Sequence, residues 1–293
     1  MKTELKGAGI LAGVGIFYSL YGVFSKLMGD AFAPFYQSWS RGIICFLLLT
    51  LITILFRQYK HIKRRDIKWF LIIGICGGMT DAVFFIAVTH ISLGVTLFLF
   101  YACVTLMNYI FGKVLFGEKI TLLKKVSAIS AVVGVALLYQ DKLSFVGATP
   151  LYLFCAGLAG VFAGTYYSFN KKVGDSYSNY QVAATNNFIG VIVTFIISMI
   201  LTEPMNTAFM SFPWFINIVF AIVQTVVMAL LILGFRFIEV QKGGLILLLE
   251  PILAMVWGYV LFKESLGIVT IIGCMSVLVA MVLPLFEKPE RAY

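Results

Sequence analysis

The sequence predicts an all-α polytopic membrane protein whose ten transmembrane helices form two inverted five-helix repeats. First, 61% of the 293 residues are hydrophobic and only 12% are charged, whereas a soluble domain has roughly 25% charged residues. Second, the apolar segments approach the ~20 residues that a helix needs to cross a hydrocarbon layer of ~30 Å. Third, residues 15–30 recur in similar form at residues 160–175, and internal repeats are typical of transporter folds.

Charged residues, proline and glycine divide the apolar sequence into ten expected helices. Membrane strands would instead give short segments of alternating polarity. The longest hydrophilic segment, 57–68, is too short for a soluble catalytic domain, which usually has ~50 residues or more. Any functional site is therefore expected in or at the membrane. The expected helices cover residues 7–29, 33–56, 67–89, 92–114, 122–140, 147–170, 179–201, 212–236, 241–262 and 265–286.

The recurring segment opens each half of the chain. GIFYSLYGVFSKLMGD at 15–30 and GVFAGTYYSFNKKVGD at 160–175 are identical at seven of sixteen positions. An odd number of helices per copy makes the second copy enter the membrane from the opposite side, so the repeats are expected to be inverted. The matched positions include Tyr21 with Tyr166 and Lys26 with Lys171, and the two repeats are expected to cover residues 1–143 and 144–293.

The basic residues indicate the orientation in the membrane. Most of the 22 Lys and Arg residues fall in segments on the same side as the N-terminus, and such residues accumulate in cytoplasmic loops. We therefore expect a multi-pass protein of the cytoplasmic membrane with both termini in the cytoplasm. The net charge of +9 then requires no nucleic-acid partner. The first apolar segment lacks the short core and cleavage site of a signal peptide, so we expect it to be retained.

Three charged residues within the expected helices are the first candidates for function, because charge at membrane depth is costly. They are Arg41, Asp81 and Glu250. Pro251 follows Glu250 and predicts a helix kink beside this carboxylate, which suits substrate binding or coupling. Arg41 and Asp81 have opposite signs and can form a structural ion pair. Alternatively, an unpaired Asp81 makes the cavity acidic together with Glu250, which favours cationic or zwitterionic ligands.

Aromatic and polar residues at helical spacing complete the expected substrate site. Glu250, Ala254 and Trp257 lie on one helix face, and aromatic faces beside carboxylates attract organic cations. Aromatic residues also fill lipid-facing and interfacial positions, and the same residues can have that structural role. The candidate substrate-binding residues are Tyr18, Tyr21, Asp81, Tyr101, Thr105, Tyr166, Asn170, Glu250 and Trp257, and the candidates for coupling or a structural ion pair are Arg41, Asp81 and Glu250.

Other polar residues and the glycines are interpreted as structural. Asn186, Asn187 and Gln224 are expected to join helices by hydrogen bonds. Glu118 and Glu264 are expected at interfaces, where they cap the following helices or pair with Lys119 and Lys263. Small residues at four-residue spacing allow close helix packing. They are the pairs Gly9/Gly13, Gly74/Gly78 and Gly160/Gly164.

Several short motifs together carry a resemblance to a known family. LFGEKIT at 115–121 and LFKESLG at 261–267 end corresponding helices of the two copies, and LLLEPILA occupies 247–254. With Lys26 ending the first helix and Arg41 in the second, the chain resembles EamA-type members of the drug/metabolite transporter superfamily over essentially its whole length. The first copy departs from the pattern, with Val104 and Thr105 where the Glu-Pro pair would fall.

The resemblance implies a central cavity formed mainly by the first four helices of each repeat, and secondary transport of small organic molecules, often export. We expect alternating-access transport of an amino acid, amine or related amphipathic metabolite, with protons as a further candidate partner. Uptake of a quaternary amine or other organic cation, and flipping of a lipid-linked carrier, remain the alternatives. The lipid bilayer is the expected surrounding, and the chain is expected to be a monomer or a weak homodimer.

The sequence contains none of the motifs that would indicate an enzyme. There is no GxSxG, HExxH, CxxC or phosphate-binding glycine loop. The five cysteines lie within expected helices without paired spacing, so neither a disulfide framework nor a metal site is expected. We therefore expect no catalytic residues, no metal and no cofactor.

Overall fold

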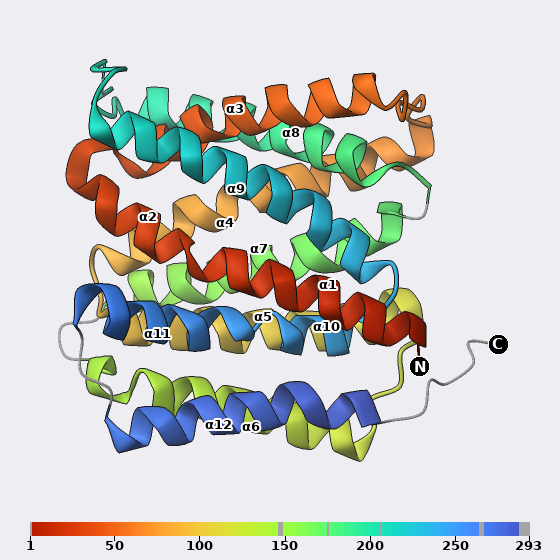
Figure 1. Cartoon of the computed structure of the whole chain (residues 1–293), viewed down its shortest axis with the longest axis vertical. Helices are drawn as coiled ribbons and strands as arrows, with labels where there is room; N and C mark the ends of the chain where they lie inside the picture. The colour runs from red at the N-terminus through yellow and green to blue at the C-terminus, as the bar shows by residue number, and fades with distance from the viewer. Residues whose placement is uncertain (1, 146–148, 175, 206, 264–266, 287–293) are drawn as a thin grey trace.

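The apolar segments form helices that cross the molecule back and forth, as the computed structural model in Figure 1 shows. The structure describes residues 2–145, 149–174, 176–205, 207–263 and 267–286. The first half contains α1 (Lys2–Ser19), α2 (Tyr21–Met28), α3 (Pro34–Leu55), α4 (Ile67–Val88), α5 (Leu93–Phe116) and α6 (Leu122–Leu138). The second half contains α7 (Pro150–Gly174), α8 (Asn179–Ile200), α9 (Phe212–Phe235), α10 (Val240–Ile246), α11 (Leu249–Phe262) and α12 (Ile268–Val282).

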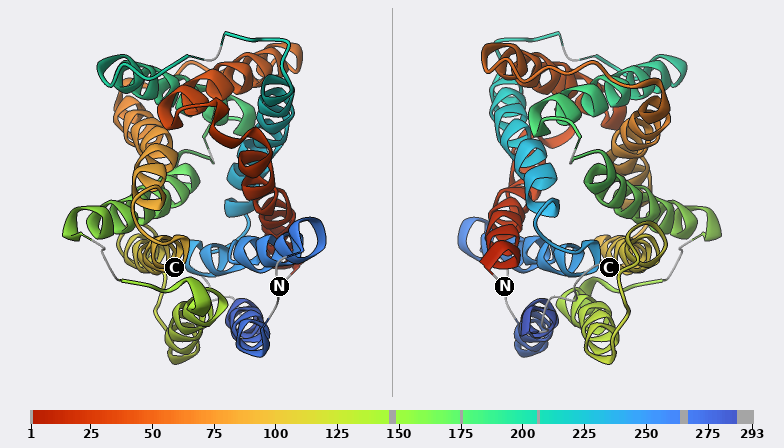
Figure 2. Two further views of the ribbon diagram at one scale, coloured as in Figure 1. Left: turned by 90° about the vertical axis from the view of Figure 1, so that its left-hand side faces the viewer. Right: turned by 90° about the vertical axis from the view of Figure 1, so that its right-hand side faces the viewer.

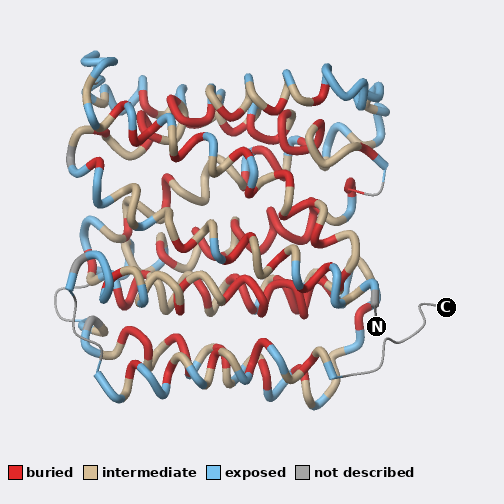
Figure 3. The backbone as a smooth tube through the Cα atoms, in the orientation of Figure 1, coloured by how far each residue is buried: buried red, intermediate tan, exposed pale blue. Residues whose placement is uncertain are grey.

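The helices have the length and surface of a membrane protein. Within the described residues, nine segments are long and apolar enough to span a bilayer, and α6 is a slightly shorter apolar helix of 17 residues. Figure 3 shows buried residues along the inner faces of the helices and exposed residues on their outer faces and in the loops. Many outward side chains are large and apolar, including Leu47, Ile129, Ile200 and Ile271. The predicted fold class, an all-α multi-pass membrane protein, is confirmed.

Two of the predicted spans are each built from two helices. The first breaks at Leu20, between α1 and α2. The Ser19 hydroxyl just before this break donates to the carbonyl of Ile16 at 2.6 Å, and serine bonds of this kind bend helices. The span expected at residues 7–29 is therefore present, and the break at Leu20 divides it into two helices.

The ninth span breaks before Glu250, where the sequence predicts a kink. Pro251 has no N–H to offer the carbonyl of Leu247. That carbonyl instead accepts from the N–H of Glu250 at 3.0 Å. This tighter turn separates α10 from α11 and leaves Glu250 in the first turn of α11.

Helix packing follows the pseudo-two-fold relation between the repeats. α5 packs against α7 as α11 packs against α1, and α4 packs against α7 as α9 packs against α1. α3 meets α8 and α6 meets α12, each pairing corresponding helices of the two copies. Viewed along the helices, α3 and α8 lie at one end of the bundle and α6 and α12 at the other (Figure 2). We call the face where α1 begins and α12 ends the terminal side, and the opposite face the far side (Figure 1).

Glycines allow the closest helix approaches, although not at every predicted pair. A Cβ at Gly160 would lie 2.3 Å from the carbonyl oxygen of Phe100, and one at Gly78 would lie 2.7 Å from the Cα of Gly190. The third and sixth spans therefore pack through glycine, as predicted. The same interpretation of Gly9 and Gly13 is wrong, because a Cβ at either position meets no atom within 4 Å.

Gly160→Ala is expected to destabilise the protein, because the added methyl group would collide with backbone of α5. Overpacking of this kind costs ~1–3 kcal/mol. The measurement is thermal unfolding of the purified protein in detergent. Gly9→Ala is the matched control, since its methyl group meets open space. An equal loss of stability in the two variants would contradict the packing role of Gly160.

Candidate functional site

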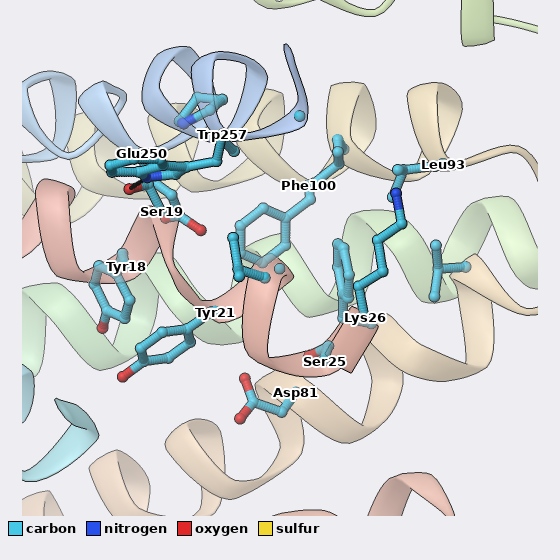
Figure 4. A pocket seen from close by; sticks show the side chains of 18 of the residues that line it. Tyr18, Ser19, Tyr21, Ser25, Lys26, Asp81, Leu93, Phe100, Glu250 and Trp257 are labelled. Carbon is cyan, nitrogen blue, oxygen red and sulfur yellow. Dashed lines mark hydrogen bonds between the residues drawn. The ribbon is translucent and has the colours of Figure 1, made fainter. Parts of the chain in front are cut away.

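A cavity of about 500 Å³ lies toward the far side of the bundle. Its walls come from the end of α1, α2, the last turns of α4, the first turns of α5, and α11, with single residues from α3, α9 and the end of α6. The cavity therefore lies between the two repeats and draws on both. Figure 4 shows Glu250, Trp257 and Ser19 together on one wall, and Tyr21 near Asp81 on another. The predicted residues that line it are Tyr18, Tyr21, Arg41, Asp81, Tyr101, Glu250 and Trp257.

Glu250 is the acidic group that the cavity presents from α11. Its side chain is half-buried, and the hydroxyl of Tyr101 on α5 lies within hydrogen-bonding reach of it. Ala254 and Trp257 line the same cavity, which confirms the shared face predicted from their spacing. The indole N–H of Trp257 donates to the Ser19 hydroxyl at 2.8 Å. This hydrogen bond links α11 to the break between α1 and α2, close to the Glu250 carboxylate.

Arg41 and Asp81 form the ion pair that the sequence left open. A guanidinium nitrogen of Arg41 lies 2.8 Å from Oδ2 of Asp81. The Nε group of Arg41 also donates to Gln224 on α9, and the guanidinium lies 4.0 Å from the centre of the Phe220 ring. The Arg41 side chain is only 2% exposed, whereas that of Asp81 is 37% exposed. The cation is therefore fixed in place, and the anion stays accessible from the cavity.

A small second cavity of about 40 Å³ lies on the other side of this ion pair. Arg41 and Asp81 line both cavities, so the pair separates them. The hydroxyls of Tyr21, in the larger cavity, and of Tyr166, in the smaller one, have no hydrogen-bond partner among the described residues. A water molecule needs only ~10–15 Å³ and a few polar partners, so the small cavity suits ordered water.

Besides Tyr166, which lines only the smaller cavity, two predicted substrate-binding residues lie away from the larger cavity. Thr105 lines an apolar groove between α5 and α6 on the outer surface. Asn170 is fully buried, where it donates to the carbonyl of Tyr166 and accepts from Asn186 at 2.8 Å. Its polar atoms are therefore used between α7 and α8. The structure thus places these two residues outside both cavities, because their helix faces point elsewhere.

The predicted structural role of two asparagines is confirmed. Asn186 joins α8 to α7 through Asn170, and Asn187 joins α8 to α3 by donating to the carbonyl of Gly42 at 3.0 Å. Gln224 also joins two helices, although its partner is the functional candidate Arg41.

Several cavity residues carry no clear signal in the sequence. Ser19 is an ordinary small residue in an apolar helix, and only its contact with Trp257 places it in the site. Phe220 is one of 27 phenylalanines, and only its position under Arg41 distinguishes it. Lys26 does carry a signal, because it lies in a span and recurs as Lys171 in the second copy, although it is not among the predicted site residues.

Comparison with known proteins agrees with this architecture. A solved crystal structure aligns with a TM-score of 0.81 over 96% of this chain and 98% of that chain, at 16% sequence identity. This likeness shows the shared fold.

Relatives with closer sequences are described as transporters. A protein of Helicobacter pylori (strain ATCC 700392 / 26695), described as an uncharacterized transporter, is 27% identical over 183 residues. A second, from H. pylori strain J99 / ATCC 700824, has the same description and is 26% identical over 183 residues. Each alignment covers 62% of this chain and 60% of the relative, so the chain spans about three fifths of the length of these curated relatives.

The family comparison covers most of the chain. The EamA-like transporter family matches twice, over residues 5–140 and 150–286. The two matches agree with the two repeats in the structure. The chain therefore belongs to the EamA-like transporter family.

Proposed function

We propose that the chain is a secondary active transporter that moves a small amphipathic solute with an ammonium group, such as an amino acid or an amine, by alternating access. The cavity between the repeats supports this proposal, since it draws walls from both and combines charged groups with aromatic and aliphatic ones. Sites at the interface of inverted repeats suit alternating access because one repeat can rock against the other around them.

The observation that carries the proposal is the setting of Glu250. Arg41 already neutralises Asp81, and none of the ion pairs among the described residues includes Glu250. A solute ammonium at Glu250 would supply the missing positive charge. Tyr18, Tyr101 and Trp257 line the same region, and aromatic faces attract cations by about 0.5–2 kcal/mol each.

The rest of the cavity suits an apolar solute body with a second polar end. Leu97, Phe100 and Met255 provide apolar contacts. Lys26 lies at the end near Leu93, away from Glu250 (Figure 4). An amino acid with an apolar side chain matches these three features, with its ammonium at Glu250 and its carboxylate toward Lys26.

A quaternary amine is the second candidate, favoured by the aromatic side chains around Glu250. Such a solute would bind through cation–π attraction and the carboxylate without donating a hydrogen bond.

We further propose that Glu250 binds a proton when the solute leaves, which would couple transport to a proton gradient, and that the direction is export. The terminal side would then be cytoplasmic, as the basic loops favour.

A ligand screen followed by flux measurement tests this function. Amino acids, primary amines and quaternary amines are added to the purified protein, and a true ligand is expected to raise its melting temperature because it binds only the folded state. The same solute should cross proteoliposome membranes under a proton gradient.

The control variant is Glu203→Gln, which removes a carboxylate that caps α3 and does not line the cavity. It should keep the ligand response that Glu250→Gln loses. Absence of any response, together with scrambling of a lipid-linked sugar in the same proteoliposomes, would replace the solute transporter with a flippase.

A further inference from the structure

Six charged side chains gather on the terminal side of the bundle, outside the cavity. Glu118 follows α5, and the sequence predicts a structural role for it at an interface, either capping the following helix or pairing with Lys119. In the structure Glu118 pairs instead with Lys171 of α7 at 3.2 Å, and its side chain is buried. The six side chains are Glu4, Glu118, Lys124, Lys171, Glu239 and Lys242.

Glu118 and Lys171 together hold the turn that enters α10. The two carboxylate oxygens of Glu118 accept from the backbone N–H groups of Val240 at 2.7 Å and Gln241 at 3.1 Å. The ammonium of Lys171 donates to the carbonyl of Ile238 at 2.8 Å. We call this set of contacts the terminal clasp. It satisfies donors and acceptors on both sides of the start of α10.

Two further ion pairs support the clasp. Lys124 of α6 lies 2.6 Å from Glu239, and Lys242 lies 3.0 Å from Glu4 of α1. Lys124 and Lys242 are 4% and 2% exposed. Buried charges are tolerated only when they are fully paired, and removing one partner costs far more than the pair contributes. These ion pairs therefore stabilise the closed cluster, and a movement of α10 away from α5 and α7 has to break them.

The clasp lies where the ninth span changes its neighbours. Both α10 and α11 pack against α1 and α12, but α10 also packs against α5 and α7, whereas α11 also packs against α2. The cavity lies on the far side between α11 and the first turns of α5. The fourth and ninth spans thus meet on the terminal side and enclose the cavity on the far side.

We propose that the terminal clasp is the closed gate of the terminal side, with Glu118 and Lys171 as positioning residues that hold α10 against α5 and α7. Release of the clasp would let the cavity open to the terminal side. The inference rests on the proposed alternating access, but not on any particular solute.

The repeat extends the inference to Lys26. Lys26 matches Lys171 in the duplicated segment, and in Figure 4 it reaches toward Leu93 at the start of α5. The start of α5 is the counterpart of the start of α10. Lys26 would therefore act on the far side as Lys171 acts on the terminal side, by donating to the carbonyls before α5 when the far side closes.

Sided labelling of a cavity cysteine tests the gate. Ala254→Cys is introduced into the full chain with its five native cysteines replaced by alanine, and a charged, membrane-impermeant maleimide is added to one side or the other. The two sides are assigned by the accessibility of an N-terminal tag. Glu118→Gln is expected to raise the ratio of terminal-side to far-side labelling about tenfold, which corresponds to ~1.4 kcal/mol.

Gly112→Ala provides a second test that keeps every charge. Its Cβ would lie 2.6 Å from Oε2 of Glu118 and 2.8 Å from Cγ of Gln241, so it forces the clasp apart and should shift the ratio in the same direction. Glu203→Gln is the matched control, because it removes a carboxylate cap from α3 on the far side, and its ratio should stay at the wild-type value.

Lys26→Met is expected to shift the ratio in the opposite direction to Glu118→Gln. Unchanged ratios in both Glu118→Gln and Gly112→Ala, or an equal shift in Glu203→Gln, would overturn the gate. An unchanged ratio in Lys26→Met would overturn the equivalence of the two lysines. Because labelling needs no solute, a failed solute screen with shifted ratios would refute the proposed substrate class and leave the gate standing.

Discussion

Glu250→Gln is expected to weaken solute binding by roughly 100-fold without unfolding the protein. The amide keeps the shape and can still accept a bond from Tyr101, but it removes the negative charge that faces the cavity. Losing one partner of a buried charged pair costs ~2–5 kcal/mol of binding, and ~2.7 kcal/mol is a factor of 100. The measurement is the concentration of ligand that gives half of the maximal rise in melting temperature.

Two further results check the role of Glu250. Tyr101→Phe removes the hydroxyl within reach of the carboxylate, and it should weaken binding less than Glu250→Gln because the charge remains. Uphill flux driven by a proton gradient should disappear in Glu250→Gln, since the amide cannot exchange a proton. Unchanged ligand affinity in Glu250→Gln would reject the carboxylate as the ammonium site.

Asp81→Asn is expected to cost more folding stability than Arg41→Gln. Removing Asp81 leaves the Arg41 guanidinium charged in a site that is 2% exposed, with Gln224 as its remaining hydrogen-bond partner. An unpaired buried charge costs ~3–5 kcal/mol. Removing Arg41 leaves Asp81, which is 37% exposed and can be hydrated from the cavity.

The double variant completes the test of the Arg41–Asp81 pair. It should be more stable than the sum of the two single losses predicts, with a coupling of about 0.5–3 kcal/mol, because neither charge remains unpaired. Unfolding of all four proteins in the same detergent gives this coupling. Strict additivity of the two losses would show that the two side chains do not stabilise each other.

Elements with a strong local signal were predictable from the sequence. Hydropathy and length define the spans, because a helix that crosses lipid needs apolar residues along its whole length. Glu250 and the Arg41–Asp81 combination were found because charge in an apolar segment is visible without neighbours. The shared face of Glu250, Ala254 and Trp257 follows from helical periodicity alone.

Elements that depend on distant neighbours were not predictable in the same way. Thr105 and Asn170 are at suitable depth in the sequence, yet their helices turn them toward the outer surface and toward α8. Ser19 breaks a span and meets Trp257, a residue 238 positions away in the chain. Helix rotation and neighbour choice decide such contacts, and neither is recorded in local composition.

The sequence by itself determined that this protein is a duplicated, multi-pass membrane protein with acidic and aromatic residues inside it, because hydropathy and repetition are properties of the chain. Only the tertiary structure decided which charges meet. Arg41 binds Gln224, 183 positions away, and Glu118 holds the start of α10 rather than pairing with its neighbour Lys119. Which side chains form hydrogen bonds and ion pairs in a helix bundle depends on the distances between helices that are far apart in the sequence. Packing of the helices sets those distances.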